Sequence, residues 1–282
     1  MEDKCNLVRE KILNDVKKEI EELGVTPTLA VINCSDDEAS KIYIRNKLNS
    51  CNSVGIKTEF IKLEPQETDL NKLISVILDC NTKYNGVMLQ LPLDEKFKGK
   101  ENMLLNLVDS KCDIDGLCDK QKLKLINNEK DTLIPATALA VFKIMEHELG
   151  TTDFSGKKVC IISRSNLIGR PLMNLLLNNN ATPTICHSKT AKNINDYLYN
   201  NEHDIVITGI GNHFIKEQTM WKTLIIDCGL TRGYDNKLLR DVIRCECCFG
   251  HKNIYYGAVG TVTCACVAYN TLKAYKLQNG LD

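Results

Sequence analysis

Residues 157–190, KKVCIISRSNLIGRPLMNLLLNNNATPTICHSKT, contain the pattern that decides the fold of this chain. The apolar run in Lys157–Ser163 is typical of a strand buried on both faces of a parallel sheet. Ile168–Leu177 repeats apolar residues at helical spacing, with Pro171 in the first turn, where a missing backbone N–H does no harm. Ala181–Ser188 predicts a second strand. The stretch therefore predicts half of a nucleotide-binding βαβ unit, with a helix N-terminus facing a phosphate site.

The residues around this unit favour NADP over NAD. Dinucleotide sites usually carry G-x-G-x-x-G, and Gly169 alone of that fingerprint is present. An NAD site tends to have an acidic residue about 20 positions downstream. Here the second strand ends in His187, Ser188 and Lys189, which are neutral to basic. Arg164 could share a 2′-phosphate with Ser188, or it could be a solvated turn residue, and the spacing leaves both interpretations open.

The composition predicts a globular protein of about two domains. The 282 residues are 43% hydrophobic and 26% charged, and 36 basic residues balance 36 acidic ones. This balance argues against nucleic acid or an anionic membrane as a partner. No apolar run reaches the roughly 20 residues that span a bilayer, and the charged start of the chain argues against a secretory signal. We therefore expect a cytoplasmic protein.

The chain contains fourteen cysteines, which are scattered along the sequence. Because several fall in predicted strands or helices, we expect reduced, buried thiols. Cys245, Cys247 and Cys248 with His251 could ligate zinc. A structural zinc site usually pairs two such halves, however, and no second half is evident. No metal site is predicted.

Helical and strand patterns alternate along the rest of the chain. The expected helices cover residues 3–23, 36–53, 69–81, 138–149, 193–200, 216–221 and 260–277. The expected strands cover residues 27–33, 56–63, 86–93, 203–210 and 223–229. The polar, basic residues 119–131 suggest an exposed hairpin. This alternation predicts an α/β fold with parallel sheets in both halves.

Three residues of the first half could carry chemistry. Tyr43 and Lys47 are four apart on an expected helix and share one face. The phenol ring could pack against a flat substrate while a partly buried amine exchanges protons. Gln90 interrupts an apolar run, and leaving its amide unpaired would cost about 1–3 kcal/mol, so it could accept a hydrogen bond from Lys47 and orient it. The alternatives are an ordinary amphipathic helix face and a satisfied core glutamine.

Asp113 and Asp115 flank Ile114 ahead of Gly116. One carboxylate could cap a turn. The other could accept hydrogen bonds from two adjacent N–H donors of a ligand such as a 2-aminopyrimidinone. The chemistry of the residues alone does not choose between them.

Taken together, six segments resemble the bifunctional methylenetetrahydrofolate dehydrogenase/methenyltetrahydrofolate cyclohydrolase family. They are residues 40–47, 86–93, 111–116, 164–171, 186–190 and 257–263. A tyrosine four before a lysine, then QLPL, then KxDxDG, in that order, is far more specific than any one of these motifs. The resemblance covers nearly the whole chain.

The resemblance implies two α/β domains. These are an N-terminal folate-binding catalytic domain at 1–138 and a Rossmann-like NADP-binding domain at 139–260, with a C-terminal helix at 261–282 that packs back on the first domain. It implies tetrahydrofolate derivatives as substrates and a homodimer as the assembly. The implied reactions are oxidation of 5,10-methylenetetrahydrofolate by NADP and hydrolysis of the methenyl product to 10-formyltetrahydrofolate in the same cleft.

The resemblance also implies roles for individual residues. Lys47 matches the catalytic lysine, Tyr43 the ring beside the folate, and Gln90 the partner of the lysine. Asp115 matches the carboxylate that holds the pterin. Further substrate contacts are implied at Gly257 and Thr263, and cofactor contacts at Arg164, Ser165, Gly169, Ser188 and Thr190.

Two cleft loops depart from the family pattern. The family's P-C-T-P-x-G is PATALA at 135–140, and its P-G-G-V-G-P-M-T is YGAVGTVT at 256–263. The alternatives are therefore a monofunctional dehydrogenase and a non-catalytic folate- or NADP-binding relative. Short-chain dehydrogenases also use Tyr-x-x-x-Lys, but their pair follows the nucleotide-binding unit. Tyr43 and Lys47 precede that unit by more than a hundred residues, which disfavours this class.

Overall fold

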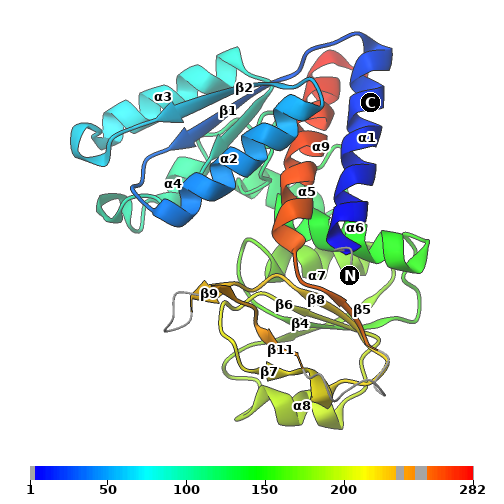
Figure 1. The fold of residues 1–282 in the computed structure, drawn as a ribbon. Helices are drawn as coiled ribbons and strands as arrows, with labels where there is room; N and C mark the ends of the chain where they lie inside the picture. Colours follow the sequence, from blue (N-terminus) through cyan, green and yellow to red (C-terminus); the bar gives the residue numbers. More distant parts are fainter. Residues whose placement is uncertain (1–3, 233–237, 245–252, 282) are drawn as a thin grey trace. The chain divides into compact units, whose positions relative to one another are not determined.

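The computed structural model describes residues 4–232, 238–244 and 253–281 (Figure 1). The chain forms two compact units, one of Arg9–Ala136 with Thr263–Asp282 and the other of Thr137–Val262 with Met1–Val8. The zinc ligands considered above, Cys245, Cys247, Cys248 and His251, lie outside the described residues.

The unit formed by 9–136 and 263–282 is built on a three-stranded parallel sheet in the order β2-β1-β3. Its strands are β1 (Thr28–Asn33), β2 (Lys57–Lys62) and β3 (Gly86–Leu89). The central strand β1 is fully buried from Leu29 to Ile32, as its continuous apolar run predicts. The crossover helices α2 (Glu38–Ser53) and α3 (Leu70–Lys83) flank the sheet (Figure 1).

Side-chain caps fix where the two crossover helices begin. The Asp37 carboxylate accepts a hydrogen bond from the backbone N–H of Ser40 at 2.7 Å, and Asp69 accepts one from Lys72 at 2.7 Å. Each bond satisfies an N–H that has no partner within its helix. Gly55, with φ 92°, follows α2 and turns the chain into β2.

Two long helices of this unit contact each other. These are α1 (Lys4–Leu23) and α9 (Val259–Asn279), and they are joined by an ion pair of 2.8 Å between Lys276 and Glu19. From Thr263 onward α9 belongs to this unit. The prediction that the C-terminal helix returns to the first domain is therefore confirmed.

The predicted hairpin at 119–131 is wrong, because residues Asp119–Ile126 form the helix α5. Alternation of lysine and leucine in Lys122–Ile126 imitates a strand pattern. Gln121 and Leu125, four residues apart, instead form the buried face of a helix. The short helix α4 (Glu101–Leu105) and 3₁₀ turns at Pro65–Glu67 and Glu95–Phe97 were also not predicted.

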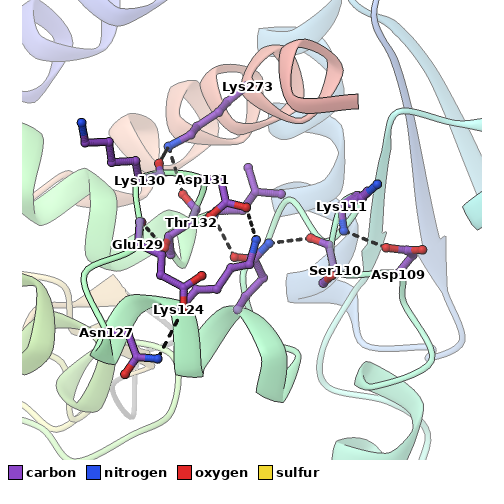
Figure 2. Close-up of polar contacts among 12 residues, drawn as sticks. Asp109, Ser110, Lys111, Lys124, Asn127, Glu129, Lys130, Asp131, Thr132 and Lys273 are labelled. Carbon is purple, nitrogen blue, oxygen red and sulfur yellow. Dashed lines mark hydrogen bonds and ion pairs between the residues drawn. The ribbon is translucent and has the colours of Figure 1, made fainter. Parts of the chain in front are cut away.

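Polar contacts join α5 to Ser110 and α9 to Thr132 (Figure 2). The buried Gln121 amide donates to the Ser110 carbonyl at 2.5 Å and accepts from the Leu133 N–H at 2.9 Å. Lys273 on α9 donates to the Thr132 carbonyl at 3.1 Å. The segment that carries Asp113 and Asp115 is thus held at Ser110 by α5.

The unit formed by 137–262 and 1–8 is built on a five-stranded parallel sheet in the order β12-β8-β6-β4-β5. The strands are β4 (Lys158–Ile162), β5 (Thr182–Cys186), β6 (Ile205–Thr208), β8 (Leu224–Asp227) and β12 (Ile254–Tyr256). The helices are α6 (Ala136–Leu149), α7 (Gly169–Asn178) and α8 (Ile194–Asn200). The strand, helix and strand predicted within 157–190 are confirmed as β4, α7 and β5.

Short elements complete this unit and correct one prediction. The expected helix at 216–221 is instead the end of the strand β7 (Ile215–Lys216) followed by a 3₁₀ turn at Glu217–Thr219. β7 pairs in parallel with β11 (Val242–Ile243), and β9 (Thr231–Arg232) pairs antiparallel with β10 (Leu238–Leu239). A run of six residues was too short for its periodicity to separate a helix from a strand and turn.

The described cysteines agree with the prediction of reduced thiols. All eleven are free, and all but the half-buried Cys228 are buried. They pack as small apolar side chains, as Cys34 and Cys80 do in the core beside β1. Among the described helices, none has the length and apolar character needed to cross a membrane.

Candidate active site

The side chains of Lys47 and Gln90 meet at the carboxyl end of the small sheet. Lys47 Nζ lies 3.0 Å from Gln90 Oε1 and 3.3 Å from Met88 Sδ, and Lys47 is only 9% exposed. β3 ends at Leu89, so Gln90 follows the strand rather than lying within it as predicted. The amide group of Gln90 donates to the Leu91 carbonyl at 2.5 Å, which turns its oxygen toward the lysine. The structure thus presents one nearly buried amine with a fixed acceptor.

Tyr43 lies one turn before Lys47 on α2 and is half-buried. Its hydroxyl makes no hydrogen bond within the described part of the chain. Two buried thiols, Cys51 and Cys264, also lie near Lys47. Burial raises the pKa of each thiol, and the lysine charge opposes that rise. Both therefore remain neutral at physiological pH, and neither neutralises Lys47.

The two carboxylates of the segment 111–116 have different surroundings. Asp113 is buried, and its Oδ2 accepts the backbone N–H of Cys118 at 2.7 Å, which closes the turn. Burial raises the pKa of Asp113 to about 6, against the hydrogen bonds from Cys118. Asp115 makes no hydrogen bond with the described residues. Burial raises the pKa of Asp115 as well, and the positive charge of Lys47 opposes this. Asp113 is thus the turn residue, and Asp115 makes no such bond.

Backbone geometry and one amide hold Asp115 in place. Gly116 has φ 63°, and a Cβ atom there would lie 2.4 Å from the Leu133 carbonyl oxygen, so only glycine fits. Asn270 on α9 is 1% exposed and donates to the carbonyls of Ile114 and Ile134, each at 2.8 Å. The sequence analysis missed Asn270. Its signal was a polar residue four positions after Cys266 on an otherwise apolar helix face.

In the other unit, a tight turn follows β4 and begins α7. Ser165 Oγ accepts the Ile168 N–H at 3.1 Å and lies 3.2 Å from Ser163 Oγ. A Cβ atom on Gly169 would lie 2.1 Å from the Ser163 carbonyl oxygen, which explains why this glycine alone remains from the fingerprint. No side chain caps α7. The Arg170 N–H donates to the Ser165 carbonyl at 3.0 Å and Pro171 has no N–H, so the start of α7 offers an anion the N–H of Gly169. The Arg164 side chain is exposed and has no partner among the described residues.

A second turn follows the neighbouring strand β5. The His187 N–H donates to Thr190 Oγ1 at 2.9 Å, and the Thr190 N–H donates to the His187 carbonyl at 2.9 Å. These bonds leave Ser188 exposed in the turn. Because β4 and β5 are parallel neighbours, their turns, with Arg164 and Ser188, lie at the same edge of the sheet.

Two buried aspartates at this edge were not predicted as functional residues. Asp241 is fully buried and accepts hydrogen bonds from Thr208 Oγ1 at 2.6 Å and from the N–H groups of Ile210 and Asn212 at 2.8 Å each. Asp227, at the end of β8, accepts the Val242 N–H at 2.9 Å, and burial raises its pKa. They join the ends of β6 and β8 to the loop before β11. An aspartate closing an apolar strand was the available signal.

The two remaining candidates lie in different units. Gly257 follows β12 in the unit that contains the five-stranded sheet, and a Cβ atom there would lie 2.7 Å from the Tyr255 ring. Thr263 lies on α9 in the unit that contains Lys47, and it is half-buried. Among the described residues, no group of histidine, cysteine, aspartate and glutamate side chains could hold a metal ion.

These features define a class of protein: a two-unit α/β enzyme with a dinucleotide-binding turn in one unit and a buried lysine at a strand end in the other. Family models for tetrahydrofolate dehydrogenase/cyclohydrolase match both parts, the catalytic domain at residues 4–115 and the NAD(P)-binding domain at residues 135–279. The chain belongs to the tetrahydrofolate dehydrogenase/cyclohydrolase family. The resemblance and the fold class predicted from the sequence are confirmed.

Individual relatives can be aligned with this chain along almost their whole length. The bifunctional protein FolD of Ruminiclostridium cellulolyticum is 35% identical over 280 residues, covering 96% of this chain and 95% of that protein. That of Nautilia profundicola is 36% identical over 279 residues, covering 95% and 94%. The crystal structure of the bifunctional FolD enzyme of Campylobacter jejuni has a TM-score of 0.84 at 27% identity, covering 98% of each chain. The chain is thus an enzyme of one-carbon folate metabolism with dehydrogenase and cyclohydrolase activities and an NAD(P)-binding domain.

Proposed function

We propose that this enzyme oxidises 5,10-methylenetetrahydrofolate with NADP and then hydrolyses the methenyl product to 10-formyltetrahydrofolate, with Lys47 serving the hydrolysis. The observation that carries this proposal is the nearly buried amine of Lys47 held 3.0 Å from Gln90 Oε1. An amine withdrawn from water and held in one orientation is suited to exchanging a proton at a defined atom. The same contact would be unnecessary for a surface lysine.

In this mechanism, bound NADP supplies the hydride acceptor for the first step. That step requires the reacting rings to be positioned rather than protonated, and the Tyr43 ring is suited to packing against the folate. In the second step, a water oxygen bonds to the methenyl carbon and gives up a proton that Lys47 exchanges through Nζ. The hydroxyl group of this adduct then loses its own proton as the bond from the carbon to N5 breaks and N5 gains a proton, which leaves the formyl C=O on N10 and releases one proton overall. Gln90 keeps Nζ directed during this exchange.

Two surfaces would hold the substrates. Asp115, which makes no hydrogen bond with the described residues, would accept two adjacent N–H groups of the pterin. Gly257 and Thr263 would add substrate contacts. The uncapped start of α7 and the absence of a carboxylate in the turn after β5 fit a 2′-phosphorylated dinucleotide. The residues that would bind this cofactor are Arg164, Ser165, Gly169, Ser188 and Thr190.

The organisation of the chain forms part of this proposal. The catalytic domain would cover residues 1–138, the cofactor domain 139–260, and the returning helix 261–282. We also propose a cytoplasmic homodimer. The free, mostly buried thiols of the described cysteines support the location, and the family resemblance supports the assembly.

The test is an assay of the purified chain with 5,10-methylenetetrahydrofolate and each nicotinamide cofactor, followed at the absorbances of the reduced cofactor and of the methenyl compound. We expect NADPH to form and the methenyl absorbance to rise and then decay faster than without enzyme. A methenyl product that decays only at the uncatalysed rate would identify a monofunctional dehydrogenase, a candidate that the altered loop at 256–263 favours. No turnover with either cofactor would identify a binding protein.

A further inference from the structure

A pocket of about 500 Å³ opens at the amino edge of the five-stranded sheet. Its lining includes Lys158 at the start of β4, His203 and Asp204 before β6, and Thr223 before β8. Because the strands are parallel, this edge is opposite the one that carries Arg164. The pocket volume lies within the roughly 300–1,000 Å³ of small-molecule sites. The proposed reaction uses no residue of this pocket.

Two exposed aromatic rings line the pocket over an apolar base. Tyr199 at the end of α8 is 76% exposed, and Trp221 before β8 is 59% exposed. Leu198, Val206 and Met220 are buried among the lining residues. Partly exposed aromatic rings at a pocket are suited to stacking on a flat ring, which buries apolar area on both partners.

One residue of the lining, His203, has an unsatisfied polar atom. Nε2 of His203 is buried and has no hydrogen-bond partner among the described residues. The imidazole ring stacks on Tyr197 with centroids 5.9 Å apart, which fixes its plane. Burial lowers the pKa of His203, as does the charge of Lys158, while Asp204 opposes them. The ring is therefore neutral at pH 7. A ligand that paired with Nε2 would remove an unpaired-group cost of about 1–3 kcal/mol.

The pocket lining also includes charged side chains near this histidine. Lys158 and Lys222 line the pocket and make no ion pair within the described part of the chain. Of the two acids in the lining, Asp204 accepts the backbone N–H of Lys158 at 2.8 Å, which directs its carboxylate toward the start of β4. Glu202 is exposed. The two lysines make the pocket able to hold an anionic group beside the stacked ring.

We propose that this pocket binds a planar heteroaromatic ring carrying a phosphate, of the class of the purine mononucleotides. The base stacks on Trp221 and Tyr199, its polar edge pairs with His203 Nε2, and the phosphate lies by Lys158 and Lys222. A purine edge offers both donors and acceptors, so it satisfies either tautomer of the neutral imidazole. The site is separate from the cofactor edge of the same sheet.

Trp221 is the single tryptophan of the chain, so its fluorescence reports on this pocket directly. Titration of the full chain with adenosine monophosphate should quench it saturably. Adenosine should bind about tenfold more weakly, and inorganic phosphate alone should cause no quenching. The absence of saturable quenching by the nucleotide, or equal affinity for nucleotide and nucleoside, overturns the proposal.

Four variants locate the binding. His203→Phe and Lys158→Met should each weaken nucleotide binding about tenfold, which corresponds to about 1.4 kcal/mol, and Lys158→Met should leave dehydrogenase activity unchanged. Lys11→Met, at an exposed lysine of α1 in the other unit, is the matched control and should bind normally. Normal binding by both pocket variants overturns the proposal. So does binding that Arg164→Ala abolishes and Lys158→Met preserves, because the nucleotide then occupies the cofactor edge.

Discussion

Replacing Gln90 with leucine isolates the contact on which the hydrolysis mechanism depends. The change introduces an apolar side chain and removes the oxygen that lies 3.0 Å from Lys47 Nζ. Lys47 then keeps Met88 Sδ, at 3.3 Å, which is a weak acceptor. A hydrogen bond to a charged group contributes about 1.5–3 kcal/mol. If that contribution is made in the transition state of hydrolysis, the rate should fall about 10–150-fold.

The two activities should respond differently to this change. Hydride transfer depends on the positions of the two rings, so NADPH formation should change little, while the methenyl compound should accumulate. Gln90→Glu keeps an acceptor oxygen and should retain more hydrolysis than Gln90→Leu. Gln66→Leu is the control, since Gln66 is an exposed glutamine bonded to Asp36 at 3.3 Å. Both rates come from one reaction followed at two wavelengths, with thermal unfolding measured alongside.

Two results would refute this reasoning. Hydrolysis by Gln90→Leu at the rate of the unchanged enzyme would mean that the amide does not orient the lysine during the reaction. An equal fall in both activities together with a lower Tm would mean that Gln90 supports the fold rather than the chemistry.

Three further predictions concern the supporting residues. Burial raises the pKa of Asp113 to about 6. The free energy of unfolding is therefore highest below the pKa of this group in the unfolded chain, near 3.9, and falls by about 3 kcal/mol as the pH rises to about 6. Asp113→Asn should flatten this fall, as measured by urea unfolding, and an unaltered pH profile would contradict the assignment. Arg164→Ala should weaken NADP binding at least about tenfold, the effect of losing one charge-assisted bond, and weaken NAD far less; equal losses would argue against the 2′-phosphate contact. Gly116→Ala should destabilise the chain by more than Gly99→Ala. Both glycines have positive φ, but only at Gly116 would the new Cβ lie close to a backbone atom, 2.4 Å from the Leu133 carbonyl oxygen. Equal Tm shifts would show that backbone strain, and not crowding, restricts this turn to glycine.

Much of the fold could be predicted because buried parallel strands have continuous apolar runs. β1, β4 and β8 were found in this way, and α7 was found from its helical spacing. The failures have local causes. In α5, alternating lysine and leucine matched the period of a strand, and only packing against the rest of the unit reveals its buried face.

The candidate site was predicted in part for a different reason. Lys47 and Gln90 are 43 residues apart, and nothing local links them, so the expected contact came from the chemistry of a lone amide and a lone amine. The sequence could not show which of Asp113 and Asp115 caps the turn, because that depends on which carboxylate reaches the Cys118 N–H in the folded chain. Asn270 escaped notice because its partners are backbone carbonyls more than a hundred residues away.

The central claim is that the amine at position 47 carries the hydrolysis and not the oxidation. The most direct measurement is the fate of the methenyl compound in Lys47→Met, followed in the presence of NADP from the methylene substrate. We predict that NADPH still forms while the methenyl compound disappears only at the rate seen without enzyme. Enzymatic hydrolysis that survives the loss of this amine would contradict the account.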